Sequence, residues 1–242
     1  MDFTGKVIVI TGAGQGLGAA FAKDFASLGG DVVLLGRTAS KVEKIAKEIQ
    51  AAGGRAWAAG CDVGDSTQVE DCFQQILNRY GKVDVLVNNA AYHRSCTVLE
   101  TSLEEWKKHL DSNLNGTFYC IKAVLPGMIA RRYGKIINMS SSGAKLFFPG
   151  FGAYAASKGG IVSLSQILSE EVKDYNINVN SVYLGMTNTE HTRERMDSDG
   201  AVTISLDEML QVEEVAKVIR FLASDDAAPI MGAAIDVFGK KA

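Results

Sequence analysis

The sequence predicts one α/β domain, residues 1–242, in which helices cover both faces of a parallel sheet of seven strands. Short apolar runs alternate with longer amphipathic stretches along the chain. Several runs are apolar at consecutive residues, as expected for strands that are covered on both faces. Such alternation builds a parallel sheet through right-handed crossovers, and the chain length fits a single domain of this kind.

The elements follow from these patterns in order. The expected strands are Lys6–Ile10, Asp31–Leu35, Arg55–Ala59, Val83–Val87, Lys135–Met139, Asn178–Val182 and Ala234–Val237. The expected helices are Leu17–Leu28, Ser40–Ala52, Ser66–Tyr80, Leu103–Asp111, Leu114–Arg132, Ala153–Tyr175 and Gln211–Ser224. Pro126 predicts a bend, or a late start to a second helix. The polar segment Met186–Asp207 is long for a connection and is expected to be a mobile loop or lid.

Composition excludes several classes of protein. A net charge of −3 and a pI near 5.7 argue against nucleic acid or an anionic membrane as partner. No apolar run approaches the roughly 20 residues that span a bilayer, and the N-terminus has no signal-peptide layout. The cysteines show no metal-binding or disulfide pattern, so the sequence predicts no metal site. They are expected to be reduced packing thiols in a cytoplasmic protein.

A glycine cluster, Thr11 to Gly18, directly follows the first strand and opens the first helix. Glycines let the backbone approach a pyrophosphate closely, and a helix N-terminus offers free N–H donors. The alternative is that these glycines only shape a turn, but the strand–turn–helix context favours a dinucleotide site.

Tyr154 and Lys158 are four residues apart, so on a helix both side chains lie on one face. A neighbouring ammonium favours the phenolate and lowers the tyrosine pKa from its usual value of about 10. Such a tyrosine can donate a proton to a carbonyl oxygen or accept one from an alcohol. The alternative is a packed tyrosine with a solvated hydroxyl and an exposed surface lysine.

These features and three others together resemble the short-chain dehydrogenase/reductase family. The motifs are T-G-x-x-x-G-x-G from Thr11, then Asn88-Asn89-Ala90-Ala91, Asn113, Ser141 and Tyr154-x-x-x-Lys158. The resemblance runs essentially from end to end. It implies a three-layer, doubly wound Rossmann fold and a homotetramer, in which Leu114–Arg132 and Ala153–Tyr175 form one interface. It also implies hydride transfer between a nicotinamide cofactor and a small-molecule ketone or secondary alcohol.

The resemblance implies roles for particular residues. Tyr154 would be the general acid or base, Lys158 would lower its pKa and hold the nicotinamide ribose, and Ser141 would bond the substrate oxygen. Ser140 and Ser142 compete with Ser141, which the thirteen-residue spacing from Tyr154 favours. Asn113, at a helix break, would orient a water molecule that links Lys158 to solvent. The expected cofactor-binding residues are Gly12, Gln15, Gly16, Leu17, Gly18, Arg37, Asp62, Val63, Asn89, Tyr154, Lys158, Gly185, Thr187 and Thr189.

The end of the second strand bears on the choice of cofactor. An acidic residue there would bond the ribose hydroxyls and repel a 2′-phosphate. Here the strand ends in Gly36, followed by Arg37, which can form charge-assisted bonds to a phosphate. The sequence therefore favours NADP(H) over NAD(H). Gln15 weakens this preference, because many NADP-binding relatives carry a basic residue there, and Arg37 as a solvated loop residue is the alternative.

The substrate wall is expected to include His93, Ser141, Phe147 and Tyr154. Further candidates are Tyr92, Ser95, Lys145–Phe148, Phe151, His191 and the Met186–Asp207 loop. Leu146, Phe147 and Phe148 form either an apolar flank of the site or a core or subunit contact.

Two other functions stay open. Relatives that reduce 3-oxoacyl thioesters on acyl carrier protein grip the acidic carrier with basic residues. Arg131 and Arg132 fit one half of that arrangement, but Tyr175 takes the second basic position, so a small free ketone or alcohol ranks first. A dinucleotide-sensing protein without catalysis is the other alternative, although such proteins commonly lose the tyrosine or the lysine.

The sequence departs from the family at three places. Ala91 replaces a glycine, Leu184-Gly185 replaces Pro-Gly, and the tail reads Phe238-Gly239-Lys240-Lys241. These changes bear on the contacts expected around Leu184–Thr189, and none of them touches the proton-transfer group.

Overall fold

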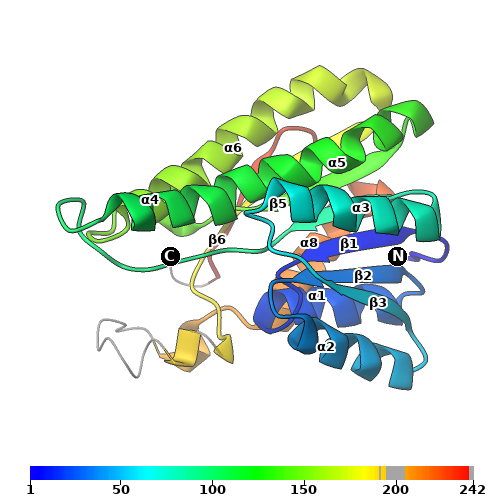
Figure 1. Cartoon of the computed structure of the whole chain (residues 1–242), viewed down its shortest axis with the longest axis horizontal. Helices are drawn as coiled ribbons and strands as arrows, with labels where there is room; N and C mark the ends of the chain where they lie inside the picture. Colours follow the sequence, from blue (N-terminus) through cyan, green and yellow to red (C-terminus); the bar gives the residue numbers. More distant parts are fainter. Residues whose placement is uncertain (191, 195–204, 240–242) are drawn as a thin grey trace.

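The computed structural model describes residues 1–190, 192–194 and 205–239, and it contains one seven-stranded parallel sheet (Figure 1). The strands are β1 Val7–Thr11, β2 Asp31–Gly36, β3 Arg55–Gly60, β4 Val85–Asn88, β5 Gly134–Met139, β6 Ile177–Leu184 and β7 Ala234–Val237. Their order is β3-β2-β1-β4-β5-β6-β7, and every neighbouring pair is parallel. The predicted doubly wound sheet is confirmed.

Helices cover both faces of the sheet and complete three layers. They are α1 Gly16–Ser27, α2 Ala39–Ala51, α3 Ser66–Tyr80, α4 Leu103–His109, α5 Gly116–Arg131, α6 Gly152–Val172 and α8 Val212–Ala223. Figure 1 shows α3, α5 and α6 on one side of the sheet and α1 and α2 on the other. Local capping sets several ends: the Asp65 carboxylate accepts hydrogen bonds at the start of α3, and Gly81 ends it in the left-handed conformation with φ 72°.

Of the two outcomes predicted for Pro126, the late start of a second helix is wrong. Helix α5 runs without interruption from Gly116 to Arg131, with Pro126 inside it, so no second helix starts late. The helix break expected around Asn113 is one turn of π-helix, Leu110–Asn115, whose flanking residues keep helical backbone angles. It joins α4 to α5 without a loop.

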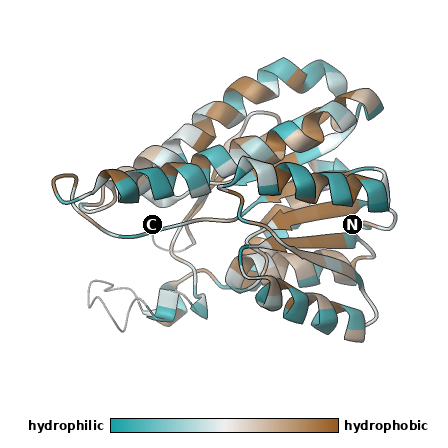
Figure 2. Ribbon diagram, viewed as in Figure 1, coloured by the Kyte–Doolittle hydropathy of each residue, from teal (hydrophilic) through white to brown (hydrophobic). Residues whose placement is uncertain are grey.

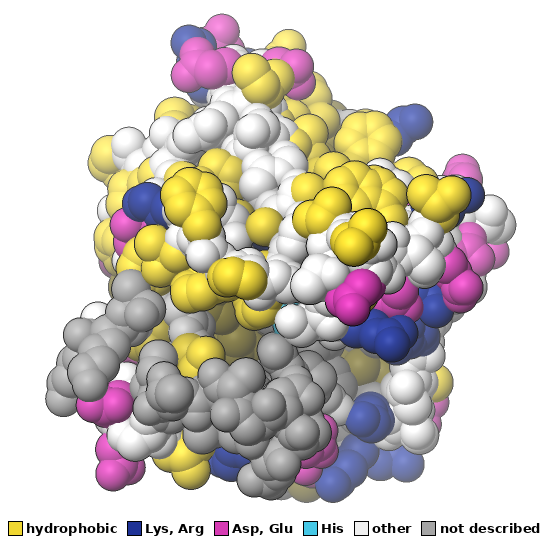
Figure 3. Space-filling model, turned by 90° about the vertical axis from the view of Figure 1, so that its left-hand side faces the viewer, with side chains coloured by type: hydrophobic (Ala, Val, Ile, Leu, Met, Phe, Trp, Pro, Cys, Tyr) yellow, Lys and Arg dark blue, Asp and Glu magenta, His cyan; other side chains and the backbone are white. Residues whose placement is uncertain are grey.

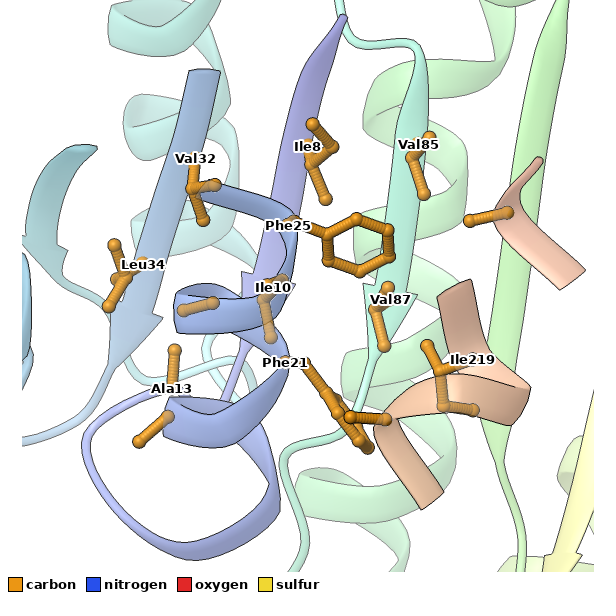
Figure 4. Packing of buried hydrophobic residues seen from close by; sticks show 14 of the residues in the cluster. Ile8, Ile10, Ala13, Phe21, Phe25, Val32, Leu34, Val85, Val87 and Ile219 are labelled. Atoms are coloured by element: carbon orange, nitrogen blue, oxygen red, sulfur yellow. The ribbon is translucent and has the colours of Figure 1, made fainter. Parts of the chain in front are cut away.

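Two hydrophobic clusters hold the layers together. One packs β1, β2 and β4 against α1 and α8, through residues such as Phe21, Phe25 and Ile219 (Figure 4). The other lies on the opposite face of the sheet, where it includes Phe73, Ile121 and Leu168 of α3, α5 and α6. Strand β1 and most of β2 are apolar at consecutive residues, whereas the helices show polar outer surfaces (Figure 2). Both faces of the sheet are thus buried, as the consecutive apolar runs predicted.

The order of the strands reverses at β1, whose neighbours β2 and β4 lead to opposite halves of the sheet. In open α/β sheets a ligand crevice forms at the carboxyl ends of the strands beside such a reversal. The expected Met186–Asp207 loop lies near this edge in its described parts, and residues 191 and 195–204 are outside the described residues. In the described part of the chain, no helix is both long and apolar enough to span a bilayer.

Candidate active site

The glycine turn after β1 is packed so closely that side chains would not fit. A Cβ atom on Gly12 would lie 2.8 Å from the Ala90 Cα, and one on Gly18 would lie 2.3 Å from the Gly12 carbonyl oxygen. The Asn89 side-chain amide donates to the carbonyls of Thr11 and Gly12 at 3.0 and 3.2 Å. Asn89, predicted to line the nucleotide channel, therefore holds the shape of the turn.

The turn leaves the start of α1 open to an anion. Gln15, the residue before the helix, makes no side-chain cap, and the first turn of α1 contains no acidic residue. Gly16 has a φ of 53°, and a Cβ there would approach the Thr189 side chain at 3.6 Å, so Thr189 lies over the turn. These features fit the pyrophosphate of a dinucleotide, because uncapped N–H groups and bare backbone face one point. Leu17 instead packs against the core.

A cavity of about 130 Å³ lies beside this turn at the carboxyl ends of β1 to β4. Its lining is Gly12, Gly36, Arg37, Cys61, Asp62, Val63, Ala90, Ala91, Tyr92 and Ser112. The Asp62 carboxylate accepts from the Gly64 amide at 3.0 Å, which fixes its position in the wall. The cavity thus brings together the predicted adenosine contacts Arg37, Asp62 and Val63 with the phosphate turn.

Tyr154 and Lys158 lie together on α6, as their spacing predicted. The Lys158 ammonium is 5.8 Å from the centre of the Tyr154 ring and is almost fully buried. It donates a hydrogen bond of 2.7 Å to the Met139 carbonyl at the end of β5. Burial lowers the pKa of Lys158 to about 8, since a low-dielectric environment disfavours the ammonium.

Three serines, Ser140 to Ser142, follow β5, and the contacts of the first two differ. The Ser140 hydroxyl is buried and donates to the Lys158 carbonyl at 2.9 Å, which anchors α6 to the sheet. Ser141 is half-buried, and its oxygen accepts from the Gly143 amide at 3.1 Å. This contact uses a lone pair and leaves the Ser141 hydroxyl proton for another acceptor. The geometry favours Ser141 over Ser140 as the group that bonds a substrate.

Asn113 is completely buried in the π-helical turn. Its side chain accepts from the Tyr92 amide at 2.7 Å and donates to the Tyr92 carbonyl at 3.0 Å and to the Ser157 hydroxyl at 2.9 Å. The Thr117 hydroxyl donates to the Asn113 carbonyl at 2.7 Å. The side chain thus ties the segment after β4 to α6, one residue before Lys158. Each of the two Asn113 oxygens accepts one of these bonds and keeps a second lone pair, so the water molecule linked to Asn113 stays a prediction.

An aromatic cluster surrounds Tyr154. The rings of His93 and Phe151 lie 4.6 and 5.9 Å from the Tyr154 ring, and Phe151 also contacts His93 at 4.7 Å. The structure brings His93 to Tyr154, as predicted. It does not bring Phe147 there, because that side chain is 99% exposed. Since the loop after β5 turns Phe147 outward, Phe151 supplies the aromatic contact.

The buried side chain of His109 lies behind this aromatic cluster. Its Nδ1 lies 2.8 Å from the Glu105 carbonyl and its Nε2 lies 3.2 Å from the Arg94 amide. A carbonyl only accepts and an amide only donates, so Nδ1 carries the proton and Nε2 accepts. The ring packs against Tyr92 at 4.9 Å. Neutral His109 therefore supports the loop that carries His93.

The segment after β6 is held by the sheet. The Gly185 amide donates to the Val237 carbonyl at 2.8 Å, and a Cβ at Gly185 would lie 2.8 Å from the Phe238 Cα. Thr187 is buried, and its hydroxyl donates to the Gly185 carbonyl at 3.1 Å. Gly185, Thr187 and Thr189 thus run from β6 toward the glycine turn.

Ala91 lies in the cavity wall with an ordinary negative φ, so this position needs no glycine.

The loops after β4 and β5 form the rim of the site. The Cys96 amide donates to the Gly150 carbonyl at 2.9 Å, and a Cβ on Gly152 would lie 2.8 Å from Val98. Large apolar side chains on these loops are exposed: Val98, Leu99, Phe147 and Phe148. Figure 3, which faces the carboxyl ends of the strands, shows hydrophobic groups on both flanks of a hollow. Phe147 and Phe148 are exposed, so they are not core residues, and an apolar flank and a subunit contact both fit this segment.

Comparisons with known proteins agree with this geometry. Residues 6–200 match the family model described as short chain dehydrogenase. Meso-2,3-butanediol dehydrogenase of Serratia marcescens is 36% identical, with 99% of this chain and 95% of that protein covered. The 3-oxoacyl-(acyl-carrier-protein) reductase of Pseudomonas aeruginosa is also 36% identical, over 99% and 98%. The chain belongs to the short-chain dehydrogenase/reductase family, and it is an oxidoreductase of that family.

Solved structures extend the agreement to three dimensions. A 3-oxoacyl-(acyl-carrier protein) reductase from Brucella melitensis with bound NAD has a TM-score of 0.88 at 30% identity, over 98% of this chain and 91% of that one. A variant of actinorhodin polyketide ketoreductase with NADPH has a TM-score of 0.91 at 30% identity, over 98% of both chains. One of these structures thus holds NAD and the other NADPH.

Sequence reasoning did not assign roles to several residues that build the site. His109 supports the aromatic cluster and Ser157 bonds the Asn113 side chain. Neither residue belongs to a recognisable sequence motif. Lys41, in the first turn of α2, donates a hydrogen bond of 2.6 Å to the Gln15 side chain. Strands β1 and β2 are neighbours, so the first turn of the helix after β2 must lie near the glycine turn after β1. The predicted topology could therefore have indicated that Lys41 lies near this turn.

Proposed function

We propose that the protein transfers a hydride between NADP(H) and a ketone or secondary alcohol of a small molecule, with Tyr154 as general acid and base. One observation carries the proposal: a buried ammonium, Lys158, lies 5.8 Å from the centre of the Tyr154 ring. When bound, the nicotinamide supplies the hydride chemistry, and the protein supplies orientation and electrostatics.

Tyr154, Lys158 and Ser141 have separate roles in the proposed reaction. Tyr154 gives a proton to the carbonyl oxygen during reduction and takes it back during oxidation. The charged form of Lys158 favours the phenolate, and its two N–H groups beyond the Met139 bond suit the ribose hydroxyls. Ser141 donates its hydroxyl proton to the substrate oxygen, where negative charge grows during reduction.

The preference for NADP(H) rests on the end of β2. Gly36 supplies no carboxylate, and Arg37 lines the cavity with its side chain exposed. A phosphate there would meet a guanidinium rather than a repelling acid. NAD(H) remains the less favoured cofactor.

Reduction of a 3-oxoacyl group on acyl carrier protein is the second candidate, and relatives with that activity favour it. The basic residues expected to grip the carrier already have partners. Arg131 donates to the Val83 carbonyl at 2.6 Å, and Arg132 donates to the Asp174 carbonyl while its guanidinium lies over the Tyr175 ring. These partners are neutral and leave both charges in place, so the ranking rests on Tyr175, which takes the second basic position and keeps a free ketone or alcohol ahead of the carrier-bound substrate.

We also propose a homotetramer in the cytoplasm. Helices α5 and α6 expose Phe118 and Ile167, which suits a helix-to-helix contact between copies of this chain. All four cysteines are free thiols, which agrees with a reducing compartment. Light scattering of the purified protein tests the first point.

The activity is tested by following NADPH absorbance with a panel of ketones, oxoacyl thioesters and sugars. Oxidation with free ketones that exceeds oxidation with the thioesters supports the proposal. Thioesters as the sole substrates would assign the second candidate. Clear NADPH binding without turnover on any compound would favour a dinucleotide sensor.

A further inference from the structure

Lys41 contacts the glycine turn from the neighbouring helix. Its ammonium donates a hydrogen bond of 2.6 Å to the Gln15 side-chain oxygen. A Cβ added to Gly14 would lie 2.9 Å from the Lys41 Cβ, so the stem of the lysine lies directly against the turn. The contact places a cation next to Gln15, the position whose lack of charge weakened the NADP(H) prediction.

The charge on Lys41 is not neutralised by this contact. Lys23, Lys108, Lys145 and Lys173 all pair with carboxylates on the surface. Lys41, in contrast, bonds a neutral amide, which carries no counter-charge. An exposed ammonium of this kind keeps its attraction for an anionic ligand.

Further features make the surroundings of Lys41 favourable for an anion. Arg37 lines the cavity at the end of β2, four residues before Lys41. Helix α2 begins at Ala39 with no acidic residue in its first turn, and Thr38 makes no side-chain cap there. Among the residues that line this cavity, Asp62 is the one carboxylate, and it accepts the Gly64 amide.

We propose that Lys41 is a specificity residue for the cofactor: with Arg37 it binds a phosphate monoester on the adenosine ribose. The proposal rests on the proposed use of NADP(H). Lys41 supplies, from α2, the cation that a basic residue in place of Gln15 would otherwise supply. Gln15 holds the ammonium over the turn, and the phosphate joins or replaces this amide contact.

The test measures binding of cofactor fragments, so it requires no substrate. Adenosine 2′,5′-bisphosphate and adenosine 5′-monophosphate differ only in the 2′-phosphate. Isothermal titration with both ligands is compared in wild type, Lys41→Ala, Lys41→Arg and Lys47→Ala. Lys47 is the matched control, because it is an exposed lysine on the same helix, about 9 Å further from the turn along the axis.

In wild type the bisphosphate is expected to bind more tightly than the monophosphate. Lys41→Ala should weaken the bisphosphate about ten-fold and the monophosphate less than two-fold, since one charge-assisted contact is lost. Lys41→Arg should keep most of the affinity, and Lys47→Ala should behave as wild type.

The outcomes separate the two proposals. Equal affinity for both ligands in wild type would overturn the preference for NADP(H) and the role of Lys41 with it. A clear wild-type preference that survives intact in Lys41→Ala would overturn the role of Lys41 alone. If Lys41→Ala weakens the binding of both ligands by the same factor, Lys41 only supports the shape of the turn, and the specificity role would also be overturned. Thermal unfolding of each variant checks that the fold is retained.

Discussion

The Lys158 ammonium donates to the Met139 carbonyl at 2.7 Å, which joins α6 to the end of strand β5. The lysine reaches this carbonyl at the cost of burying a positive charge. Its pKa is lowered to about 8 for that reason, whereas a lysine in the unfolded chain titrates near 10.5.

This shift predicts a pH-dependent difference between wild type and Lys158→Met. Below about pH 8 both states of wild type carry the charge, and folding bears the full burial cost. Between about pH 8 and 10.5 the unfolded chain binds more protons, so the wild-type free energy of unfolding rises with pH. Relative to Lys158→Met it should rise by roughly 3 kcal/mol across this window. Urea unfolding at several pH values measures the difference, and a constant offset would contradict the prediction.

Tyr154→Phe should reduce kcat about a thousand-fold and leave NADPH affinity within two-fold, because only the proton-transfer group is removed. Stopped-flow turnover and fluorescence titration measure the two quantities. Tyr175→Phe is the control, since Tyr175 lies beneath Arg132 outside the aromatic cluster. Retention of most of the activity in Tyr154→Phe would refute the assigned role.

Asn113→Ala should lower the free energy of unfolding by about 2–4 kcal/mol, because it leaves two partly buried backbone groups of Tyr92 without these partners. It should also lower kcat, since the Tyr92 segment carries His93. Ser157→Ala removes just one of the side-chain contacts of Asn113 and should cost about 1 kcal/mol. Equal costs for the two variants would show that the Tyr92 contacts contribute little.

His93 has a packing contact and a proposed polar role, and two variants separate them. His93→Phe keeps a ring against Tyr154 but cannot bond a substrate oxygen, so KM should rise about ten-fold with kcat nearly unchanged. His93→Ala should lower kcat as well, because Tyr154 loses its neighbour. If His93→Phe leaves KM as in wild type, His93 does not bind the substrate.

Gly18→Ala should destabilise the fold by about 2–4 kcal/mol, since its Cβ would lie 2.3 Å from a backbone oxygen. Cofactor binding should be lost together with the shape of the turn. Gly159→Ala, on α6 with no atom within 4 Å of the added Cβ, should gain up to about 1 kcal/mol. Thermal unfolding and cofactor titration of both variants provide the comparison.

The elements and their order were predictable because short, mainly apolar runs, several of them apolar at consecutive residues, alternate with amphipathic helices. The pairing of Tyr154 with Lys158 followed from helical spacing alone. Other features depend on tertiary packing, which local patterns do not encode. Pro126 sits inside an unbroken α5, and Phe147 turns outward while Phe151 turns in. The contact between Lys41 and Gln15 joins residues from different helices, so no single stretch of sequence shows it.

The hydrogen bond between the Cys96 amide and the Gly150 carbonyl connects the two loops that border the entrance. A change in the length or stiffness of either loop will therefore alter the conformation of the other loop. Efforts to alter substrate range by randomising one loop alone work against this coupling. Libraries that vary both loops together, with that backbone pairing retained, explore shapes that the scaffold tolerates.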